Sequence, residues 1–331
     1  MRTFSELDIE RMLEKISGVT VLVVGDVMLD HYIWGEVSRI SPEAPVPIVH
    51  VQRETFNAGG AANVALNLAG LGAKVRLLSC WGEDDSGRTL SGMLDQSGID
   101  FTTCVRSRQV STINKTRVVA RTQQVCRIDY EPSPSDYEQA AKGTFDILSS
   151  ALNGCDAVIV SDYAKGFVNQ ALLDSLADIA NSKNVKIAID PKPTRPLTIK
   201  KPWLITPNYQ ESLHLASLAQ NTPYTKEIVR QISNAIHERI MPENLVITLG
   251  SNGMVLSDPE GEQKYFSTFA REVCDVSGAG DTVIATLVAA CASGADMETA
   301  ISLSNIAAGI VVGKLGTVPI TSDLVKSAFS K

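Results

Sequence analysis

The apolar positions of the chain alternate between short continuous runs and longer stretches with helical spacing. The short runs are rich in Val, Ile and Leu, as is typical of strands buried on both faces of a sheet. They lie at 19–25, 73–79, 156–162, 185–190, 203–207 and 244–250. The stretches with helical spacing lie between them, at 61–72, 135–152, 170–182 and 226–240. This alternation predicts an α/β fold with a central, mostly parallel sheet flanked by helices.

Two segments break this rhythm, residues 32–56 and residues 101–130. Both alternate apolar and polar residues, which predicts strands with one polar face. We expect them to form a small β-sheet that acts as a lid over the active cleft. Ordinary edge hairpins are the alternative. A single domain over residues 1–331 with these two lid segments is favoured over two domains.

Charge and hydropathy exclude several classes of protein. The chain has 30 Lys and Arg against 37 Asp and Glu, a net charge of −7, which argues against a general nucleic-acid binder. We find no apolar run near the ~18 residues that span a bilayer, and the first 16 residues mix acids and bases where a signal peptide is apolar. We therefore expect a cytoplasmic protein with no membrane or nucleic-acid partner. The scattered histidines and cysteines predict no zinc site.

The sharpest chemical signal is the sequence DVSGAGDT at 275–282, directly before the apolar stretch 283–292. Two glycines allow successive amides to face an anion at the start of a helix, where the helix dipole also favours negative charge. Asp281 fits a base that accepts a proton from an attacking hydroxyl while the amides hold charge on a phosphoryl group. The alternative is a capped helix start in which Asp281 only complements the dipole.

Two further pieces favour a ligand site in the same fold. Asp26 follows the first strand, and ligands of open α/β sheets bind at the carboxyl ends of strands. The glycines in NAGGAAN (57–63) leave room for close approach of a ligand at the next helix, although helix packing is an equal explanation. Neither piece matches a P-loop or a strand-borne G-x-G-x-x-G, so a dehydrogenase is the weakest reading.

These pieces, in this order, resemble the ribokinase-like (PfkB) carbohydrate kinases over nearly the whole chain. GGAAN at 59–63 matches the first signature of the family, and D-x-x-G-A-G-D at 275–281 matches the second. Within the family, the resemblance is greatest to kinases that phosphorylate D-glycero-β-D-manno-heptose 7-phosphate at O1, in the supply of ADP-heptose for lipopolysaccharide core. It is carried by segments 23–49, 59–73, 161–166, 189–192, 206–211, 275–284 and 307–317.

The resemblance implies a role for each matching residue. Asp281 is the expected base, with an anion hole at Gly278, Ala279 and Gly280. Asn208 and Glu211 match an N-x-x-E motif that organises Mg²⁺ through water, although the same pattern is also a helix capping box. The expected ATP contacts are Asn208, Glu211, Thr248, Gly250, Gly253, Asn305 with the helix 308–312, and Lys192, which is equally a surface lysine. The expected sugar contacts are Asp26, Gly59, Gly60 and Asn63.

The substrate's 7-phosphate requires its own cations, because a phosphate is bound best by the planar fork of Arg or by Lys. The candidates are Arg39, Lys165, Arg117 and Arg121, and a solvated or ion-paired side chain is the alternative for each. Three of the four lie in the lid segments, so that substrate binding would drive closure of the lid. A requirement for a monovalent cation stays open.

The lid strands carry more β-branched apolar surface than a small isolated sheet leaves in water. We therefore expect a homodimer that pairs lid on lid, as the resemblance also implies. The residues expected in this contact are Val46, Ile48, Val49, Val51, Ile113, Val118, Val119 and Val125.

Two other functions compete with the heptose kinase. Another sugar kinase of the same fold, acting on a keto-deoxy sugar or a fructose phosphate, is disfavoured by the segment SRISPEAPVP (38–47). A non-catalytic sugar or nucleotide sensor would need no base such as Asp281. Related heptose kinases are often fused to an adenylyltransferase with an H-x-G-H motif, and none of the four histidines lies in one, so we expect no ADP-heptose from this chain by itself.

Overall fold

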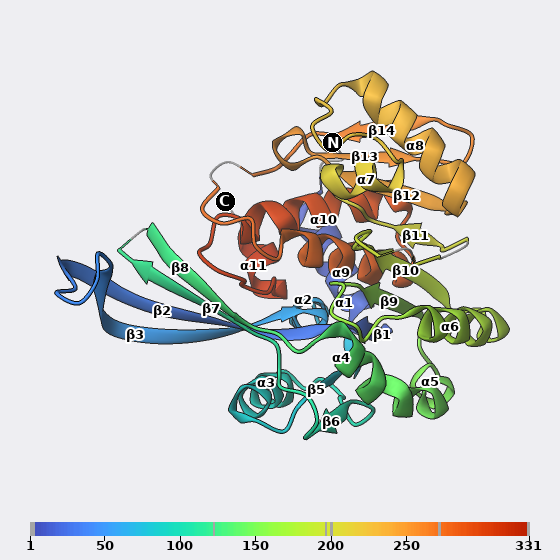
Figure 1. Ribbon diagram of the computed structural model, residues 1–331. Coiled ribbons are helices and arrows are strands. Elements are labelled where there is room, and N and C mark those ends of the chain that lie inside the picture. Colours follow the sequence, from blue (N-terminus) through green and yellow to red (C-terminus); the bar gives the residue numbers. More distant parts are fainter. Residues whose placement is uncertain (1–3, 122, 196, 199–200, 271–272, 330–331) are drawn as a thin grey trace.

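The structure is a computed structural model that describes residues 4–121, 123–195, 197–198, 201–270 and 273–329. Its main sheet has eight strands in the order β14-β13-β12-β11-β10-β9-β1-β4 (Figure 1). In this order, the neighbours from β12 through β11, β10, β9 and β1 to β4 pair in parallel. The pairs β12–β13 and β13–β14 are antiparallel. The predicted mostly parallel sheet is therefore confirmed. The bounds are β1 Thr20–Gly25, β4 Lys74–Leu78, β9 Ala157–Ser161, β10 Lys186–Asp190, β11 Leu204–Ile205, β12 Asn244–Thr248, β13 Met254–Ser257 and β14 Gln263–Phe266.

Helices cover both faces of the main sheet, which explains why its strands are continuous apolar runs. In β1, Val21 and Val23 pack in the core under the helices of one face, and Leu22 and Val24 pack in the core under the other. The first face carries α1 (Glu6–Ile16), α2 (Ala61–Gly70), α9 (Ala279–Ala292), α10 (Met297–Val311) and α11 (Ser322–Ser327). The second carries α4 (Pro134–Ala140), α5 (Phe145–Ala151), α6 (Gln170–Lys183), α7 (Tyr209–Leu215) and α8 (Lys226–Ile240).

A four-stranded sheet, called the small sheet below, projects from this body (Figure 1). Its order is β3-β2-β7-β8, with bounds β2 Val27–Ile40, β3 Pro47–Gly60, β7 Asn114–Ala120 and β8 Gln123–Tyr130. It contains most of the two expected lid segments, but its first two strands reach back to the body beyond residues 32 and 56. The start of the second segment lies elsewhere, because β6 (Val105–Ser107) pairs with β5 (Cys80–Gly82).

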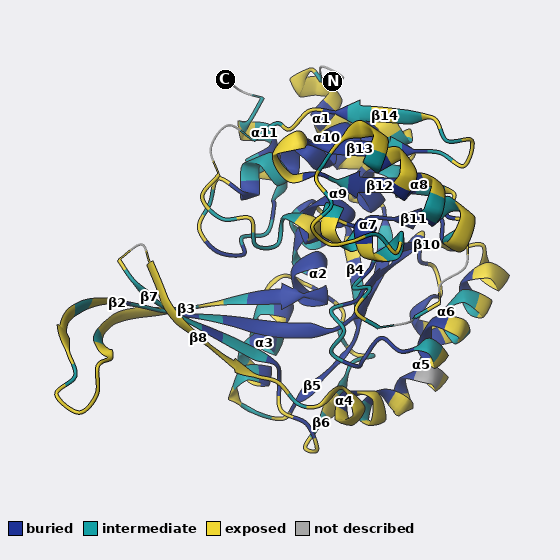
Figure 2. Cartoon of the chain, turned by 45° about the horizontal axis from the view of Figure 1, so that its top comes forward, coloured by how far each residue is buried: buried dark blue, intermediate teal, exposed yellow. Residues whose placement is uncertain are grey.

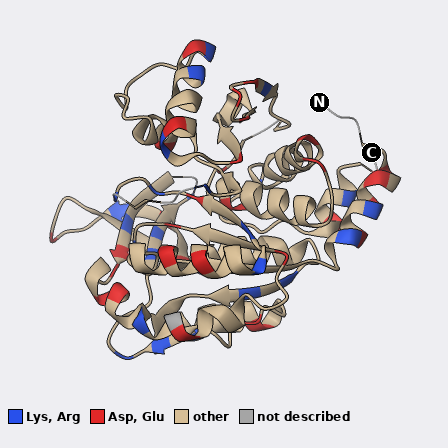
Figure 3. Cartoon of the chain, turned by 90° about the vertical axis from the view of Figure 1, so that its right-hand side faces the viewer, with Lys and Arg blue, Asp and Glu red and all other residues tan. Residues whose placement is uncertain are grey.

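The predicted helix 135–152 is two helices separated by a 3₁₀ turn at 141–144. Gly143 lies in that turn, and glycine costs about 1 kcal/mol in a helix interior relative to alanine. Among the described residues, no helix combines the length and the apolarity that a membrane crossing needs. Acidic and basic residues are interspersed along the helices that face the viewer in Figure 3. A further helix, α3, spans Asp85–Gln96.

The topology brings three acidic residues to one edge of the main sheet. In the sheet register Gly25 pairs with Ser161, and Ser161 pairs with Asp190, so β1, β9 and β10 end side by side. Asp26 and Asp162 directly follow the first two of these strands. The N-terminus of α9 lies at the same edge, because Tyr163 forms a hydrogen bond with Asp281 in the first turn of that helix.

Candidate active site

Asp281 lies in the first turn of α9 and is 2% exposed. The amide of Asn63 donates to its Oδ2 at 2.8 Å, and the hydroxyl of Tyr163 donates to its Oδ1 at 2.7 Å. Burial raises the pKa of Asp281 to about 6, with a further rise from the charge of Asp30, and the two hydrogen bonds lower it. A carboxylate with this pKa is mostly ionised at neutral pH and is well matched to accept a proton.

The start of α9 has the geometry of an anion site. Gly278 is the N-cap residue with a φ of 77°, and a side chain there would meet the amide of Asn63 at 2.7 Å. Gly280 is exposed, and a Cβ built on it would have no atom within 4 Å. The first amides of a helix have no partner within it. Gly278, Ala279 and Gly280 therefore lie at the helix start where an anion hole is expected. The amide of Ala279 donates to the carbonyl oxygen of Val276 at 3.2 Å, and the open space lies at Gly280.

Asp30 is a site residue that the sequence analysis missed. It lies in β2, is 6% exposed, and is close enough to raise the pKa of Asp281. The guanidinium of Arg117 in β7 forms an ion pair with its Oδ1, and the hydroxyl of Thr317 lies 3.4 Å from its Oδ2. A Cβ on Gly59 would lie 2.7 Å from that Oδ2, so Gly59 is required for Asp30 to pack here.

Asp26 has a different role from the expected sugar contact. Its side chain is fully buried, and its two oxygens accept hydrogen bonds from the backbone amides of Tyr163, Lys165 and Phe167 at 3.0, 3.1 and 3.0 Å. Burial first, and then the charge of Asp162, raise the pKa of Asp26 to about 6. A carboxylate occupied in this way holds a loop, and Asp30 rather than Asp26 faces the base.

The other expected sugar residues lie around the base. Gly60 is the N-cap residue of α2, and its φ of 61° places its Cα against the carbonyl oxygen of Asp26, which a Cβ would meet at 2.3 Å. Asn63 is 1% exposed, and its side-chain oxygen accepts a hydrogen bond from Asn67 at 3.2 Å. This contact orients the amide so that its nitrogen donates to Asp281.

Asn208 and Glu211 form a capping box at the start of α7, as the alternative to a metal role predicted. The same glutamate also accepts an ion pair from Lys192 at 2.9 Å. Burial first, and then the charges of Glu211 and Asp281, raise the pKa of Asp190 well above its usual range. The capping box therefore lies in the same acidic neighbourhood as the base, next to a lysine.

The residues expected at the nucleotide's base lie together on the other side of α7. Thr248 forms a β-bridge with Asn208 at the end of β12. Gly253 packs against the backbone of residues 266–268. Asn305 in α10 donates to the carbonyl oxygen of Ser267 at 2.6 Å, which ties α10 to the same segment.

Gly253 and Gly250 give a test of this turn that does not depend on any ligand. Gly253 has a φ of 84°, and a Cβ there would lie 1.9 Å from the carbonyl oxygen of Phe266, whereas Gly250 has a φ of 58° and open space. We expect Gly250→Ala to lower the free energy of unfolding by about 1–2 kcal/mol, the cost of a left-handed alanine. Gly253→Ala should cost about 3 kcal/mol or more, because strain and a backbone clash add. Urea unfolding of both variants measures the difference, and equal losses would contradict it.

The four candidate phosphate cations do not converge in one chain. Arg117 and Lys165 lie near the base, since Arg117 pairs with Asp30 and the amide of Lys165 binds Asp26. Arg39 and Arg121 are exposed toward the outer end of the small sheet. Arg39 lies nine positions after Asp30 along β2, about 30 Å at ~3.3 Å per residue. No single sugar phosphate spans that distance together with the base.

Lys115 is a cation that the sequence analysis missed. It lies opposite Asp30 in the register of β2 and β7, and its side chain is 14% exposed. It forms ion pairs with Glu131 and Asp129, and Lys165 forms an ion pair with the same Glu131 at 2.6 Å. Two lysines therefore share one carboxylate beside the base.

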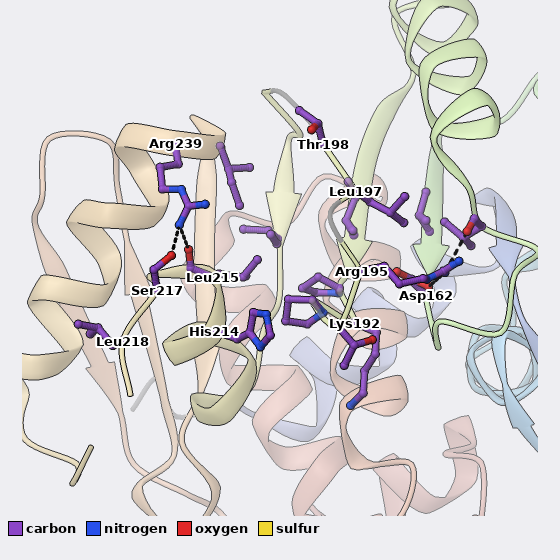
Figure 4. A pocket seen from close by; sticks show the side chains of 18 of the residues that line it. Asp162, Lys192, Arg195, Leu197, Thr198, His214, Leu215, Ser217, Leu218 and Arg239 are labelled. Carbon is purple, nitrogen blue, oxygen red and sulfur yellow. Dashed lines mark hydrogen bonds and ion pairs between the residues drawn. The ribbon is translucent and has the colours of Figure 1, made fainter. Parts of the chain in front are cut away.

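A cavity of about 760 Å³ lies behind this edge, between α7 and the connection from β10 to β11 (Figure 4). Its floor is formed by apolar strand residues, among them Val160, Ile189 and Ile205. Across it, Arg195 donates to Asp162 and to the carbonyl oxygen of Val168, both at 3.0 Å. The cavity wall thus holds the segment that follows β9.

Comparisons with known proteins identify the family of this chain. The model of the pfkB family carbohydrate kinases matches residues 20–323. The bifunctional protein HldE of Trichlorobacter lovleyi is 38% identical over 97% of this chain and 65% of its own length. That of Methylobacillus flagellatus is 41% identical over 91% of this chain and 61% of its own. The chain thus spans about three fifths of the length of the curated relatives it matches.

Solved structures show the same fold. Ribokinase of Arabidopsis thaliana, complexed with ribose and ATP, has a TM-score of 0.72 at 20% identity and covers 95% of this chain and 99% of its own. Phosphofructokinase-2 of Escherichia coli, in complex with potassium, has a TM-score of 0.74 at 17% identity, with the same coverage. The fold is therefore ribokinase-like, as predicted. With the family match over 20–323, this chain belongs to the pfkB family of carbohydrate kinases, enzymes that phosphorylate sugars with ATP.

Proposed function

We propose that this kinase transfers the γ-phosphoryl group of ATP to O1 of D-glycero-β-D-manno-heptose 7-phosphate. The observation that carries phosphoryl transfer is the buried Asp281 at the glycine-opened start of α9. The choice of a heptose is supported by relatives at 38% and 41% identity that are named HldE, a heptose kinase and adenylyltransferase. This is a step toward the activated heptose used for lipopolysaccharide.

In this proposal the O1 hydroxyl lies against the Asp281 carboxylate, which accepts its proton while the new oxygen–phosphorus bond forms. The bond between the γ-phosphorus and the bridging oxygen breaks at the same time, and ADP leaves. The amides at the start of α9 donate to the oxygens of the transferring group and stabilise the charge there. Asp30 accepts hydrogen bonds from sugar hydroxyls, and Gly59 leaves the sugar close access to it. The adenine and ribose of the nucleotide lie against Thr248, Gly250, Gly253 and Asn305, and Lys192 reaches its phosphates.

Magnesium, which the family implies, fits the donor set at this edge. The described residues contain no cluster of three His, Cys, Asp or Glu side chains that would hold a metal alone. Mg²⁺ keeps several waters and is usually held by one or two carboxylates together with substrate phosphates. Glu211, with Asn208 and Asp190 beside it, would supply those oxygens. When bound, Mg²⁺ neutralises charge on the ATP phosphates.

The proposed function is tested by measuring ATP consumption across a panel of sugar phosphates. We expect the highest kcat/KM with the 7-phosphoheptose and a product with a new phosphorus resonance for a phosphate at C1. Much weaker turnover is expected with fructose 6-phosphate and with a keto-deoxy sugar. Preference for either of these would replace the heptose with that sugar, and ATP binding without turnover of any sugar would favour a sensor.

We further propose that two copies of the chain pair through their small sheets. Side chains that face each other across neighbouring strands lie on one face, and here the faces differ. Asp30, Lys115, Arg117 and Asp129 share one face, toward the base. The opposite face carries Val37, Val49, Val51, Phe56, Val118, Ile128 and Tyr130.

Several residues of that apolar face are open to solvent in the single chain (Figure 2). Val51 is 47% exposed, Phe56 38%, Ile128 44% and Tyr130 61%. The same face also carries the ion pair of His31 and Glu54. Exposed apolar residues gathered on one face of a small sheet mark an interaction site. Two residues expected in this contact are excluded. Ile113 is 1% exposed and packs in the core of the body, and Val119 pairs with Trp34 on the face that carries Arg117.

Charged substitutions on the apolar face should separate the copies. We expect Val118→Asp and Val49→Asp to turn a dimer into a monomer at micromolar concentration and to lower activity at the same time, because burying an unpaired carboxylate costs several kcal/mol. Light scattering and an activity assay measure the two effects. Leu7→Asp in α1 is the matched control, since Leu7 is 53% exposed on the body and should keep the dimer. A fully active wild-type monomer would refute the pairing.

A further inference from the structure

The segment Asp162–Phe167 after β9 is folded around the carboxylate of Asp26. The amides of Tyr163, Lys165 and Phe167, every second residue, all point inward and donate to that carboxylate. This requires left-handed backbone between them, at Ala164 (φ 58°) and Gly166 (φ 114°). An alanine adopts that conformation only where the surroundings impose it. The three hydrogen bonds to Asp26 supply that constraint.

The same segment is held from its other side. Arg195 donates to Asp162 and to the carbonyl oxygen of Val168, one residue beyond the segment (Figure 4). The amide of Ala164 also donates to Asp162, at 2.8 Å. Both ends of the segment are therefore fixed by charged groups, although it is a loop.

The segment delivers one phenol to the base. The hydroxyl of Tyr163 lies 2.7 Å from Oδ1 of Asp281, while Asn63 donates to Oδ2. Burial first, and then the charge of Asp281, raise the pKa of Tyr163 well above its usual range, so the phenol stays protonated and donates. Donors on both oxygens fix the plane of the carboxylate and leave other lone pairs for a substrate hydroxyl.

We infer that Tyr163 is a positioning residue for the Asp281 base, and that Asp26 anchors the segment that carries it. The inference rests on the proposed role of Asp281 as the base. The other acidic groups near Asp281 are Asp30 in β2, whose charge raises the pKa of Asp281, and Asp190 in β10, whose own pKa is raised well above its usual range by burial and by the charges of Glu211 and Asp281. The phenol therefore has a second effect, because its hydrogen bond opposes the effects of burial and of Asp30 and keeps the base ionised near neutral pH.

The first test is Tyr163→Phe, followed by the carboxyl ¹³C resonance of Asp281 during a pH titration without substrate. We expect the pKa of Asp281 to rise from about 6 by about one unit, because a hydrogen bond to its charged form is lost. The acid limb of kcat/KM should move by the same amount, and the plateau of kcat should fall about tenfold as the carboxylate loses its orientation. The KM for ATP should stay unchanged.

Tyr209→Phe is the matched control. Its hydroxyl donates to the carbonyl oxygens of Thr222 and Pro223, at 3.2 and 3.0 Å, and does not touch the base. This variant should leave both the titration and the pH profile as in the wild type. An unchanged Asp281 titration in Tyr163→Phe would overturn the inference. Because the titration uses no sugar, it stands or falls separately from the proposed heptose substrate.

The anchor is tested by Asp26→Asn, which places an amide nitrogen against backbone donors. Although Asp26 does not touch Asp281, we expect the pKa of Asp281 to rise as in Tyr163→Phe. An unchanged titration would overturn the role of Asp26. If this variant fails to fold, Arg195→Gln removes the outer support of the same segment. The pKa of Asp281 is again expected to rise, and an unchanged titration of Asp281 would count against the role of the segment.

Discussion

Asp281→Asn should lower kcat by at least about 100-fold, the scale of general-base catalysis by a positioned side chain. Asparagine keeps the size of the side chain. Its one oxygen can accept the hydrogen bond from Asn63, and its NH2 group can donate to the hydroxyl of Tyr163, but it takes up no proton. The wild-type enzyme should lose activity as the pH falls through about 6, since the raised pKa of Asp281 means that roughly a tenth of the base is ionised at pH 5. Steady-state kinetics from pH 5 to 8 measure both effects.

Binding of ATP separates a lost base from a damaged site. Calorimetry should give a similar ATP affinity for Asp281→Asn and the wild type, because the anion hole is made of backbone amides. Asp84→Asn is the control, since Asp84 caps α3 and binds Thr112, away from the base, and asparagine caps a helix equally well. Near-normal turnover by Asp281→Asn would remove Asp281 from the mechanism.

The main sheet could be predicted because its strands are buried on both faces. Runs such as 156–162 and 244–250 are continuous apolar stretches with sharp ends, and β9 and β12 lie within two residues of them. Residues 297–311 gave no such signal from periodicity. The helix α10 is buried on nearly all sides, so it has no polar face to reveal a helical period.

Some residues of the site are placed by local sequence and could be predicted, and others are placed by contacts between distant segments and could not. The glycines and Asp281 are set by one helix start, so spacing alone points to them. Asp30 and Lys115 come together only through the register of β2 and β7, which no local pattern contains. The sequence does contain one indication of Asp30. It is an acidic residue inside the apolar run from Val27 to Trp34, and a buried acid must have a partner.

Asn208 and Glu211 show why the two readings of one motif need not compete. The capping box fixes both side chains at the start of α7, and that fixed carboxylate is what Lys192 contacts. Asp26 shows the opposite case. Its place after a strand puts it at the same end of the sheet as Asp281, but it is fully buried and accepts hydrogen bonds from three backbone amides of the next loop. Sequence alone does not reveal such a loop.

Lys165→Met should raise the KM for the 7-phosphoheptose by about 10- to 150-fold, the cost of one hydrogen bond between charged groups. Lys165 and Lys115 both contact Glu131, beside Asp30 and Arg117, so a phosphate entering here would take over two lysines from one carboxylate. Methionine keeps the apolar stem of the side chain and removes only the ammonium group. Initial rates with and without the 7-phosphate on the sugar measure the effect.

The two sugars decide whether Lys165 binds the phosphate or only supports the fold. In the wild type the unphosphorylated heptose should be poor, because it cannot form the charged hydrogen bonds that the 7-phosphate makes with the lysines. In Lys165→Met the penalty should fall on the phosphorylated sugar, so that the preference between the two narrows. Lys183→Met is the matched control, since Lys183 in α6 binds only the side chain of Asn153 on the surface and should keep the full preference. An equal loss with both sugars would mean that Lys165 supports the structure of its loop, and would leave Lys115 and Arg117 as the candidates that bind the 7-phosphate.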